Sequence, residues 1–175
     1  MIVLAILEGI KPERVMYYFE EITKIPRCSK HEEKISNFLV NIAKKLGLEV
    51  IQDEALNVII KKCATRGYEN SPTVILQGHM DMVCEKTPDS NHDFSKDPIK
   101  FELEGDYIIA KETTLGADNG IAIAMILAIL ESDDIPHPAI EALITTDEES
   151  GMTGANALNP DSLKGKILIN LDSEE

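Results

Sequence analysis

Short apolar segments rich in Ile, Val and Leu alternate along this chain with segments of helical periodicity. The strand-like segments lie at residues 48–51, 58–61, 73–76, 139–145 and 166–171. Segments in which apolar side chains recur every three or four residues lie at residues 12–25 and 29–46, and a third helical segment, at residues 121–130, is apolar throughout. Strands that alternate with helices predict an α/β fold with a partly parallel sheet flanked by helices.

Two of the helical segments carry additional signals. Ser29 and Glu32 form the pattern of a capping box, and Gly47 stands where a helix-terminating glycine is expected. The segment 121–130 is apolar on all sides, which is typical of a fully buried helix. These patterns predict one amphipathic helix that covers a sheet and one helix inside the core.

A hairpin is predicted between the sheet-forming segments. Residues 100–103 and 107–110 have strand character, and Glu104, Gly105 and Asp106 form a turn signal between them. An antiparallel hairpin beside parallel strands favours a mixed sheet over a purely parallel one.

Acidic residues are concentrated in the second part of the chain. Residues 1–70 contain 11 Lys and Arg and 10 Asp and Glu, whereas residues 71–175 contain 6 and 21, and the formal net charge of the whole is −14. Such a balance argues against binding to nucleic acid or to an anionic membrane. No apolar run approaches the roughly 18–20 residues that a membrane-spanning helix needs. Most of the acid excess is expected on the solvated surface, and four or five carboxylates are expected to bind cations.

The three cysteines, Cys28, Cys63 and Cys84, are odd in number and widely spaced. No Cys-x-x-Cys pair occurs, so the sequence predicts neither a thiolate zinc site nor a disulfide framework. We therefore expect a reduced, cytoplasmic protein.

Three of the predicted strands run directly into polar residues that can bind metal ions. The segment 73–76 leads to His79 and Asp81, the segment 139–145 leads to Glu148 and Glu149, and the segment 166–171 leads to Asp172. Functional sites in open α/β sheets lie beyond the carboxyl ends of the strands. These side chains are therefore expected to converge.

Asp118 is a further candidate for this site. It lies between Gly116 and Gly120, just before the buried helix. One interpretation is a helix N-cap, for which Asp is a preferred residue. The other is a metal ligand held by a loop with flanking glycines, and the sequence alone leaves both open.

The residue types define the chemistry that such a site supports. Imidazole and carboxylates without thiolate suit Zn²⁺, Mn²⁺ or Co²⁺. One histidine with several carboxylates favours two metal ions that share a bridging carboxylate and activate one water. In the adjacent pair Glu148 and Glu149, one carboxylate can bind metal while the other acts as a general base.

Four ordered motifs, QGHMDMV, TTLGADNGIA, TTDEESGM and ILINLDSEE, resemble those of the aminoacyl-histidine dipeptidases. This family of carnosinase-like Xaa-His dipeptidases belongs to a larger clan of co-catalytic zinc aminoacylases and carboxypeptidases. The resemblance implies a zinc-peptidase-like catalytic domain, of which residues 1–175 form the N-terminal portion. It also implies hydrolysis of small Xaa-His dipeptides with two Zn²⁺ ions, with Mn²⁺ and Co²⁺ as alternatives.

The resemblance assigns the metal ligands. His79 and Asp172 are expected to bind the first metal ion, Glu149 the second, and Asp118 both. The peptide bond between Asp118 and Asn119 is expected to be cis, as is typical of this clan.

The resemblance also assigns two catalytic residues. Asp81 is expected to lie behind the imidazole of His79 and to orient it. Glu148 is expected to be the general base that removes a proton from the attacking water.

Members of this family are much longer than 175 residues. They insert a lid or dimerisation domain and then return to the catalytic domain with a last histidine ligand. We therefore expect the isolated chain to bind one metal ion better than the second, to have little or no peptidase activity, and to self-associate through uncovered sheet edges. The alternatives are another peptidase or deacylase of the clan, such as a tripeptidase or aminoacylase-like enzyme, or a non-catalytic metal-binding domain.

Overall fold

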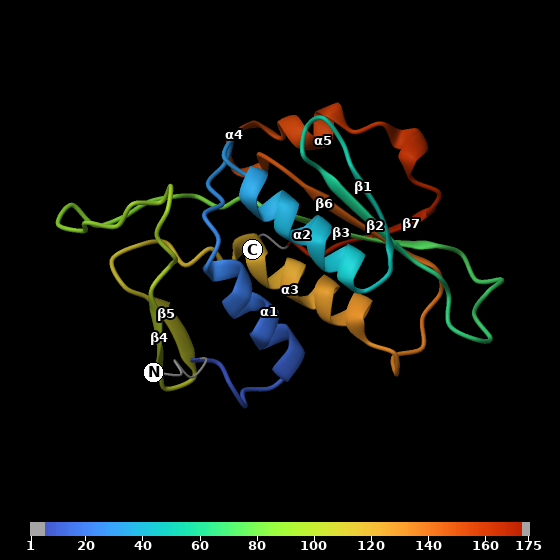
Figure 1. Ribbon diagram of the computed structural model, residues 1–175, viewed down its shortest axis with the longest axis horizontal. Coiled ribbons are helices and arrows are strands. Elements are labelled where there is room, and N and C mark those ends of the chain that lie inside the picture. Colours follow the sequence, from blue (N-terminus) through green and yellow to red (C-terminus); the bar gives the residue numbers. More distant parts are fainter. Residues whose placement is uncertain (1–5, 173–175) are drawn as a thin grey trace.

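The computed structural model of the chain describes residues 6–172 (Figure 1). Its helices are α1 (Glu13–Thr23), α2 (Glu33–Lys45), α3 (Ala117–Glu131), α4 (Glu148–Gly151), α5 (Thr153–Ala157) and the 3-10 turn η1 (Pro160–Ser162). Its strands are β1 (Glu49–Gln52), β2 (Val58–Lys62), β3 (Val74–His79), β4 (Phe101–Glu104), β5 (Tyr107–Ala110), β6 (Ile140–Thr145) and β7 (Ile167–Asn170).

Five strands form one mixed sheet in the order β1-β2-β6-β3-β7. β3 lies parallel to both β6 and β7, whereas β2 lies antiparallel to β1 and β6. The register pairs His79 with Thr145 and Gln77 with Asn170. The predicted α/β class with a partly parallel sheet is confirmed, and three parallel strands end at the same edge.

The two faces of this sheet are covered unequally. α2 and α3 cover one face, α1 packs against α3, and side chains such as Phe19, Leu39, Ile60 and Ile126 form the main core there. α4 and α5 lie on the other side (Figure 1), where the buried cluster consists of Ile59, Ile75 and Leu143. The thin second layer leaves β7 about half exposed, with Leu168 at 54%.

The helices agree with their periodicity. The segment 121–130 is helical within α3 and mostly buried, but Met125 is 42% exposed, so the prediction of a fully buried helix is only partly confirmed. α2 ends before Gly47, which adopts a φ of 69° and so provides the left-handed turn that a glycine tolerates best. Within residues 6–172, no helix combines the length and the hydropathy needed to cross a membrane.

The predicted hairpin forms, but not where it was expected. β4 and β5 pair with each other in a separate two-stranded sheet. The main sheet is mixed for a different reason, because β2 inserts antiparallel between β1 and β6. A hairpin signal is local, and it carries no information about which sheet the pair joins.

The predicted capping box at Ser29 and Glu32 is wrong. Helix α2 begins at Glu33, and no side chain caps its first turn. The Ser29 hydroxyl donates instead to Asp81 Oδ2 over 2.7 Å. The Glu32 carboxylate accepts from the backbone N–H groups of Lys30 and Asp147. The contacts with Asp81 and Asp147, both distant in sequence, take the place of the reciprocal hydrogen bonds of a capping box.

The prediction that the cysteines stay reduced is wrong for one pair. Cys28 and Cys84 form a disulfide across 56 residues of sequence. Cys63 is free and exposed. This disulfide could not be predicted from the spacing of the cysteines, because the two segments meet only in the tertiary structure. A parallel β-bridge between Cys28 and Met82 brings them together. The cytoplasmic location stays a prediction.

Candidate metal centre

The centre is built around His79, the last residue of β3. Its side chain is only 1% exposed, and its backbone N–H donates to Asn119 Oδ1 over 3.2 Å. The ring therefore lies at the carboxyl end of β3, and the hydrogen bond to Asn119 connects this strand end to α3. Only one edge of the imidazole, that of Nε2, faces the carboxylates described next.

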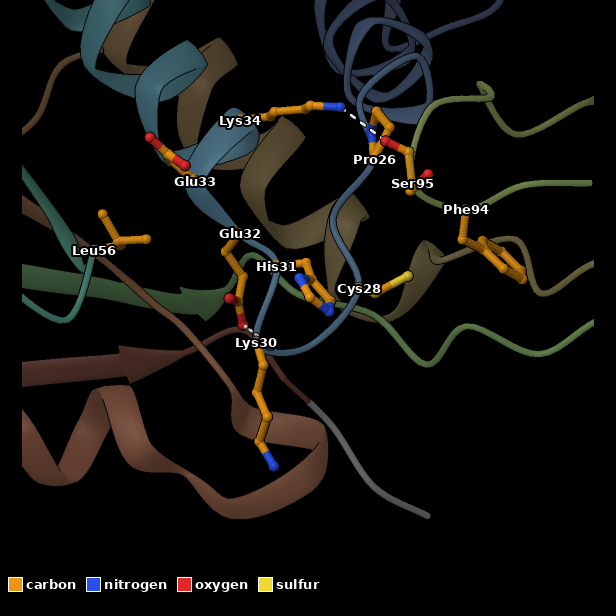
Figure 2. A pocket seen from close by; sticks show the side chains of 10 residues that line it. All are labelled: Pro26, Cys28, Lys30, His31, Glu32, Glu33, Lys34, Leu56, Phe94 and Ser95. Carbon is orange, nitrogen blue, oxygen red and sulfur yellow. Dashed lines mark hydrogen bonds between the residues drawn. The ribbon is translucent and has the colours of Figure 1, made fainter.

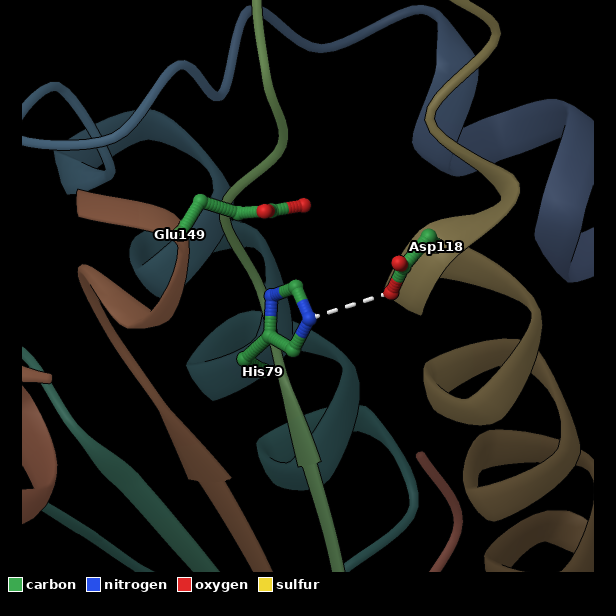
Figure 3. A group of neighbouring side chains, drawn as sticks. All are labelled: His79, Asp118 and Glu149. Atoms are coloured by element: carbon green, nitrogen blue, oxygen red, sulfur yellow. Dashed lines mark hydrogen bonds and ion pairs between the residues drawn. The ribbon is translucent and has the colours of Figure 1, made fainter. Parts of the chain in front are cut away.

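Three carboxylates approach His79 Nε2 from three different elements. Asp118 Oδ1 of α3 lies 3.2 Å away, Asp172 Oδ2 after β7 lies 3.6 Å away, and Glu148 Oε2 of α4 lies 3.9 Å away. Glu149 joins His79 and Asp118 in a second group whose ligand atoms all lie within 4.8 Å of one another. Figure 3 shows the His79 ring between Glu149 and Asp118.

The structure thus gathers all the predicted ligands in one place. Several carboxylates around a single imidazole nitrogen form a hard, anionic donor set of the kind that Zn²⁺, Mn²⁺ or Co²⁺ accepts. The residues present fit the predicted metals. The last three residues of the fourth motif, 173–175, lie outside the described part of the chain.

Asp118 lies at the non-helical start of α3, where its φ is −80° and its ψ is 115°. The helix cap is Gly116, with a φ of 71°, and no side chain provides a capping hydrogen bond. The Asp118 side chain is 70% exposed and contacts His79 Nε2. The N-cap interpretation is therefore wrong, because the carboxylate faces the imidazole rather than the first turn of the helix. The peptide bond between Asp118 and Asn119 is cis, as predicted.

Asp81 lies behind the imidazole, where the resemblance places it. Its Oδ1 lies 3.2 Å from His79 Nδ1, on the side opposite the predicted metals. The same carboxylate accepts from the backbone N–H of Glu148 over 3.1 Å and of Glu149 over 3.2 Å. One buried side chain therefore fixes the ring and the start of α4 together.

The electrostatics of this pair follow from burial and hydrogen bonding. Burial alone raises the pKa of Asp81, but hydrogen bonds from His79, Ser29 and the backbone of Glu148 outweigh it and lower that pKa to about 2. Burial lowers the pKa of His79, but the hydrogen bond and charge of Asp81 outweigh it and raise that pKa above its ordinary value. Each of the two groups therefore favours the charged form of the other.

This pair predicts a pH dependence for the metal-free chain. The folded-state pKa of Asp81 lies at about 2, below its ordinary value of 3.8. The resulting stabilisation is therefore present above about pH 4 and is lost as the pH falls toward about 2. Other carboxylates with a lowered pKa, such as Asp147, titrate in the same range, so the contribution of Asp81 is the difference between the wild type and Asp81→Asn, about 2 kcal/mol. Urea unfolding with a chelator present measures it, and an Asp81→Asn variant with the same acid-induced loss as the wild type contradicts it.

The two adjacent glutamates have similar environments. Burial raises the pKa of Glu148, and nearby Asp172 raises it further while His79 lowers it. Burial and the charge of Asp118 raise the pKa of Glu149. A raised pKa suits a general base near neutral pH. Both carboxylates lie within ligand distance of His79, so the division into base and ligand comes from the resemblance and not from these distances.

One cavity borders the centre, and a second is lined by other residues. One of about 250 Å³ has Glu148 and Asp172 in its wall beside the apolar side chains of Met152, Leu158 and Leu168. It gives a small molecule access to Glu148. Another of about 480 Å³ lies against the loop before α2 (Figure 2), where Lys34 Nζ donates to Ser95 O. None of the predicted site residues lines this second cavity among the described residues.

Asn119 is a contributor that the residue patterns did not reveal. Its Oδ1 accepts from the His79 N–H, and its Nδ2 donates to Asp172 Oδ1 over 3.3 Å. Asn119 therefore connects the start of α3 to the end of β3 and to the segment that follows β7. Only its place beside Asp118 within one of the four motifs pointed to it.

The comparisons with known proteins agree with this geometry. No protein-family model matches the chain. The chain is 44% identical over 169 residues to the cytosol non-specific dipeptidase of Escherichia coli, a match that covers 97% of this chain and 35% of that protein. The crystal structure of aminoacylhistidine dipeptidase from Vibrio alginolyticus has a TM-score of 0.94 and 48% identity, over 97% of this chain and 34% of that one.

The resemblance to the aminoacyl-histidine dipeptidases is confirmed. A tripeptidase from Staphylococcus aureus is more distant, with a TM-score of 0.79 and 29% identity over 95% of this chain and 44% of that one. The chain spans about a third of the length of the two dipeptidases. Its similarity to them extends over 97% of this chain.

Proposed function

We propose that this chain forms the N-terminal portion of the catalytic domain of a dinuclear zinc dipeptidase acting on small peptides of the Xaa-His type. The observation that carries the proposal is the convergence of Asp118, Glu148 and Asp172 on His79 Nε2 from three separate elements. The dipeptidase and tripeptidase names of the similar proteins support hydrolysis of peptides. Mn²⁺ and Co²⁺ are alternatives to Zn²⁺ for this donor set.

The metal ligands in this proposal are His79 and Asp172 at one position, Glu149 at the other, and Asp118 between them. Bound metal ions at such a site polarise a substrate carbonyl and lower the pKa of a water. The protein orients the ligands, since Asp81 fixes the ring of His79 and Asn119 holds Asp172.

Glu148 moves the proton. Its carboxylate takes a proton from the water that attacks the peptide carbonyl and delivers it to the leaving nitrogen. The hydrogen bond from its backbone N–H to Asp81 fixes the start of α4, so the base keeps its position relative to His79. Its side chain, 27% exposed, reaches both the centre and the neighbouring 250 Å³ cavity.

The single histidine in this centre affects its two metal positions differently. One position has His79, Asp118 and Asp172, whereas the other has Asp118 and Glu149. We propose that the chain by itself binds one metal ion more tightly than the second and hydrolyses peptides weakly or not at all. The half-exposed β7 favours self-association of the isolated chain.

A chimera tests the function. These 175 residues replace the matching part of the E. coli dipeptidase, and hydrolysis of Xaa-His dipeptides, other dipeptides and tripeptides is compared. We expect metal-dependent hydrolysis with dipeptides preferred. A preference for tripeptides would support the tripeptidase alternative. A correctly folded chimera that binds metal but hydrolyses none of these peptides would contradict the proposal and favour a metal-binding domain.

A further inference from the structure

Arg27 is a buried charge that the proposed mechanism does not use. It follows α1, and its side chain is only 1% exposed. Buried charges are usually paired with an opposite charge, but the hydrogen bonds of Arg27 within the described residues all go to backbone carbonyls. Nη1 donates to Met80 O over 3.1 Å and to Asp81 O over 3.0 Å, and Nη2 donates to Gly116 O.

These three carbonyls belong to the two segments that carry His79 and Asp118. Met80 and Asp81 directly follow His79, and Gly116 lies two residues before Asp118. The planar guanidinium therefore joins the end of β3 to the loop before α3. The side chains extending from these two segments bring His79 Nε2 and Asp118 Oδ1 to 3.2 Å.

The loop and the first turn of α3 leave room for this guanidinium. A Cβ atom on Gly120 would lie 2.7 Å from Arg27 Nη2, and a Cβ atom on Gly116 would lie 2.6 Å from Met82 Sδ and also collide with Nη2. Gly116 has a positive φ that by itself favours glycine, but Gly120 does not. At Gly120, the space taken by Arg27 accounts for the absence of a side chain.

Arg27 also keeps its charge in this position. Burial lowers its pKa to about 10, and the charges of Asp81, Asp118 and Glu149 oppose that effect, so the guanidinium is protonated at neutral pH. A fixed positive charge by itself repels a metal ion. The benefit of Arg27 to the centre must therefore come from the geometry it imposes.

We propose that Arg27 is a positioning residue of the metal centre, which sets the separation between His79 and Asp118 by holding the backbone of both segments. The inference depends on the proposed metal centre. It predicts that the shape of the side chain matters more than its charge.

Arg27→Lys tests this prediction, because lysine keeps the positive charge but has one terminal nitrogen in place of the Nη1 and Nη2 donors of the guanidinium. Co²⁺ is titrated into the 175-residue chain, and its visible absorption spectrum reports on coordination. We expect the variant to bind Co²⁺ at least about tenfold more weakly than the wild type, with a changed spectrum. Equal affinity and an unchanged spectrum would overturn the role of Arg27 and leave the metal centre intact.

Gly120→Ala tests the same contact by changing the residue that packs against the guanidinium of Arg27. Alanine is the better helix former, so a purely local effect would leave Co²⁺ binding unchanged. We expect weaker binding, because the added Cβ displaces the guanidinium. This variant keeps the inference testable if Arg27→Lys does not fold, and unchanged binding by Gly120→Ala would count against it.

Leu39→Ala is the control for a general loss of stability. Leu39 is a residue of α2 that is fully buried in the main core, and it does not belong to the predicted centre. If it lowers the melting temperature as much as Arg27→Lys and weakens Co²⁺ binding equally, the effect of Arg27 is merely structural and the inference fails. If the wild type itself binds no Co²⁺, the proposed metal centre fails together with the inference.

Discussion

His79→Ala is expected to abolish tight metal binding by this chain. Structural zinc sites with four protein ligands contribute about 10–16 kcal/mol, so the loss of one ligand weakens binding on the order of a hundredfold or more. The effect is larger here than for a peripheral ligand, because Asp118, Glu148 and Asp172 all approach His79 Nε2. Isothermal titration with Zn²⁺ gives both the stoichiometry and the affinity.

His31→Ala is the matched control. His31 is exposed and lines the 480 Å³ cavity, which contains none of the predicted ligands. Its replacement is expected to leave the titration unchanged. Binding of about one Zn²⁺ per wild-type chain that is lost only in His79→Ala would support two metal positions of unequal affinity. Unchanged binding by His79→Ala contradicts the assignment of the ligands.

Glu148→Gln is expected to abolish hydrolysis without removing metal. Glutamine has nearly the same shape but accepts no proton, and the loss of a general base slows a reaction about 10²–10⁴-fold. The measurement is kcat of the chimera with an Xaa-His dipeptide, together with its metal content. The hydrogen bond from the backbone of Glu148 to Asp81 does not involve the replaced group, so α4 stays in place.

Glu149→Gln separates the roles of the two neighbours. It is expected to lower metal content as well as kcat, because the resemblance assigns Glu149, and not Glu148, as a metal ligand. If Glu148→Gln loses metal while Glu149→Gln keeps it, the two roles are reversed. If neither change affects hydrolysis, the base lies elsewhere.

Much of the fold could be predicted from periodicity. The apolar spacing placed α1, α2 and the five strands of the sheet within a few residues, because side chains that face a core recur at the period of the element. The short helices α4 and α5 were not predicted, since four or five residues carry too little periodicity. Their position matters, because α4 begins with Glu148 and Glu149.

The site was predictable to a similar extent. The metal-binding residue types at the ends of three apolar strands predicted a shared edge, and the parallel pairing of β3 with β6 and β7 brings them there. Asp118 could not be assigned from local pattern alone, because Asp favours both helix caps and metal sites. Its assignment needed the resemblance, and the structure then placed its carboxylate beside His79.

The sequence by itself determined the class of fold, the residue types of the centre and their order along the chain. Those properties depend on local periodicity and on the chemistry of single side chains. Only the tertiary structure decided the disulfide between Cys28 and Cys84, the separate sheet of β4 and β5, and the contacts of Arg27 with two distant segments. These features depend on which segments meet in space, and hydrogen bonds between residues 50 to 90 positions apart leave no periodic trace in the sequence.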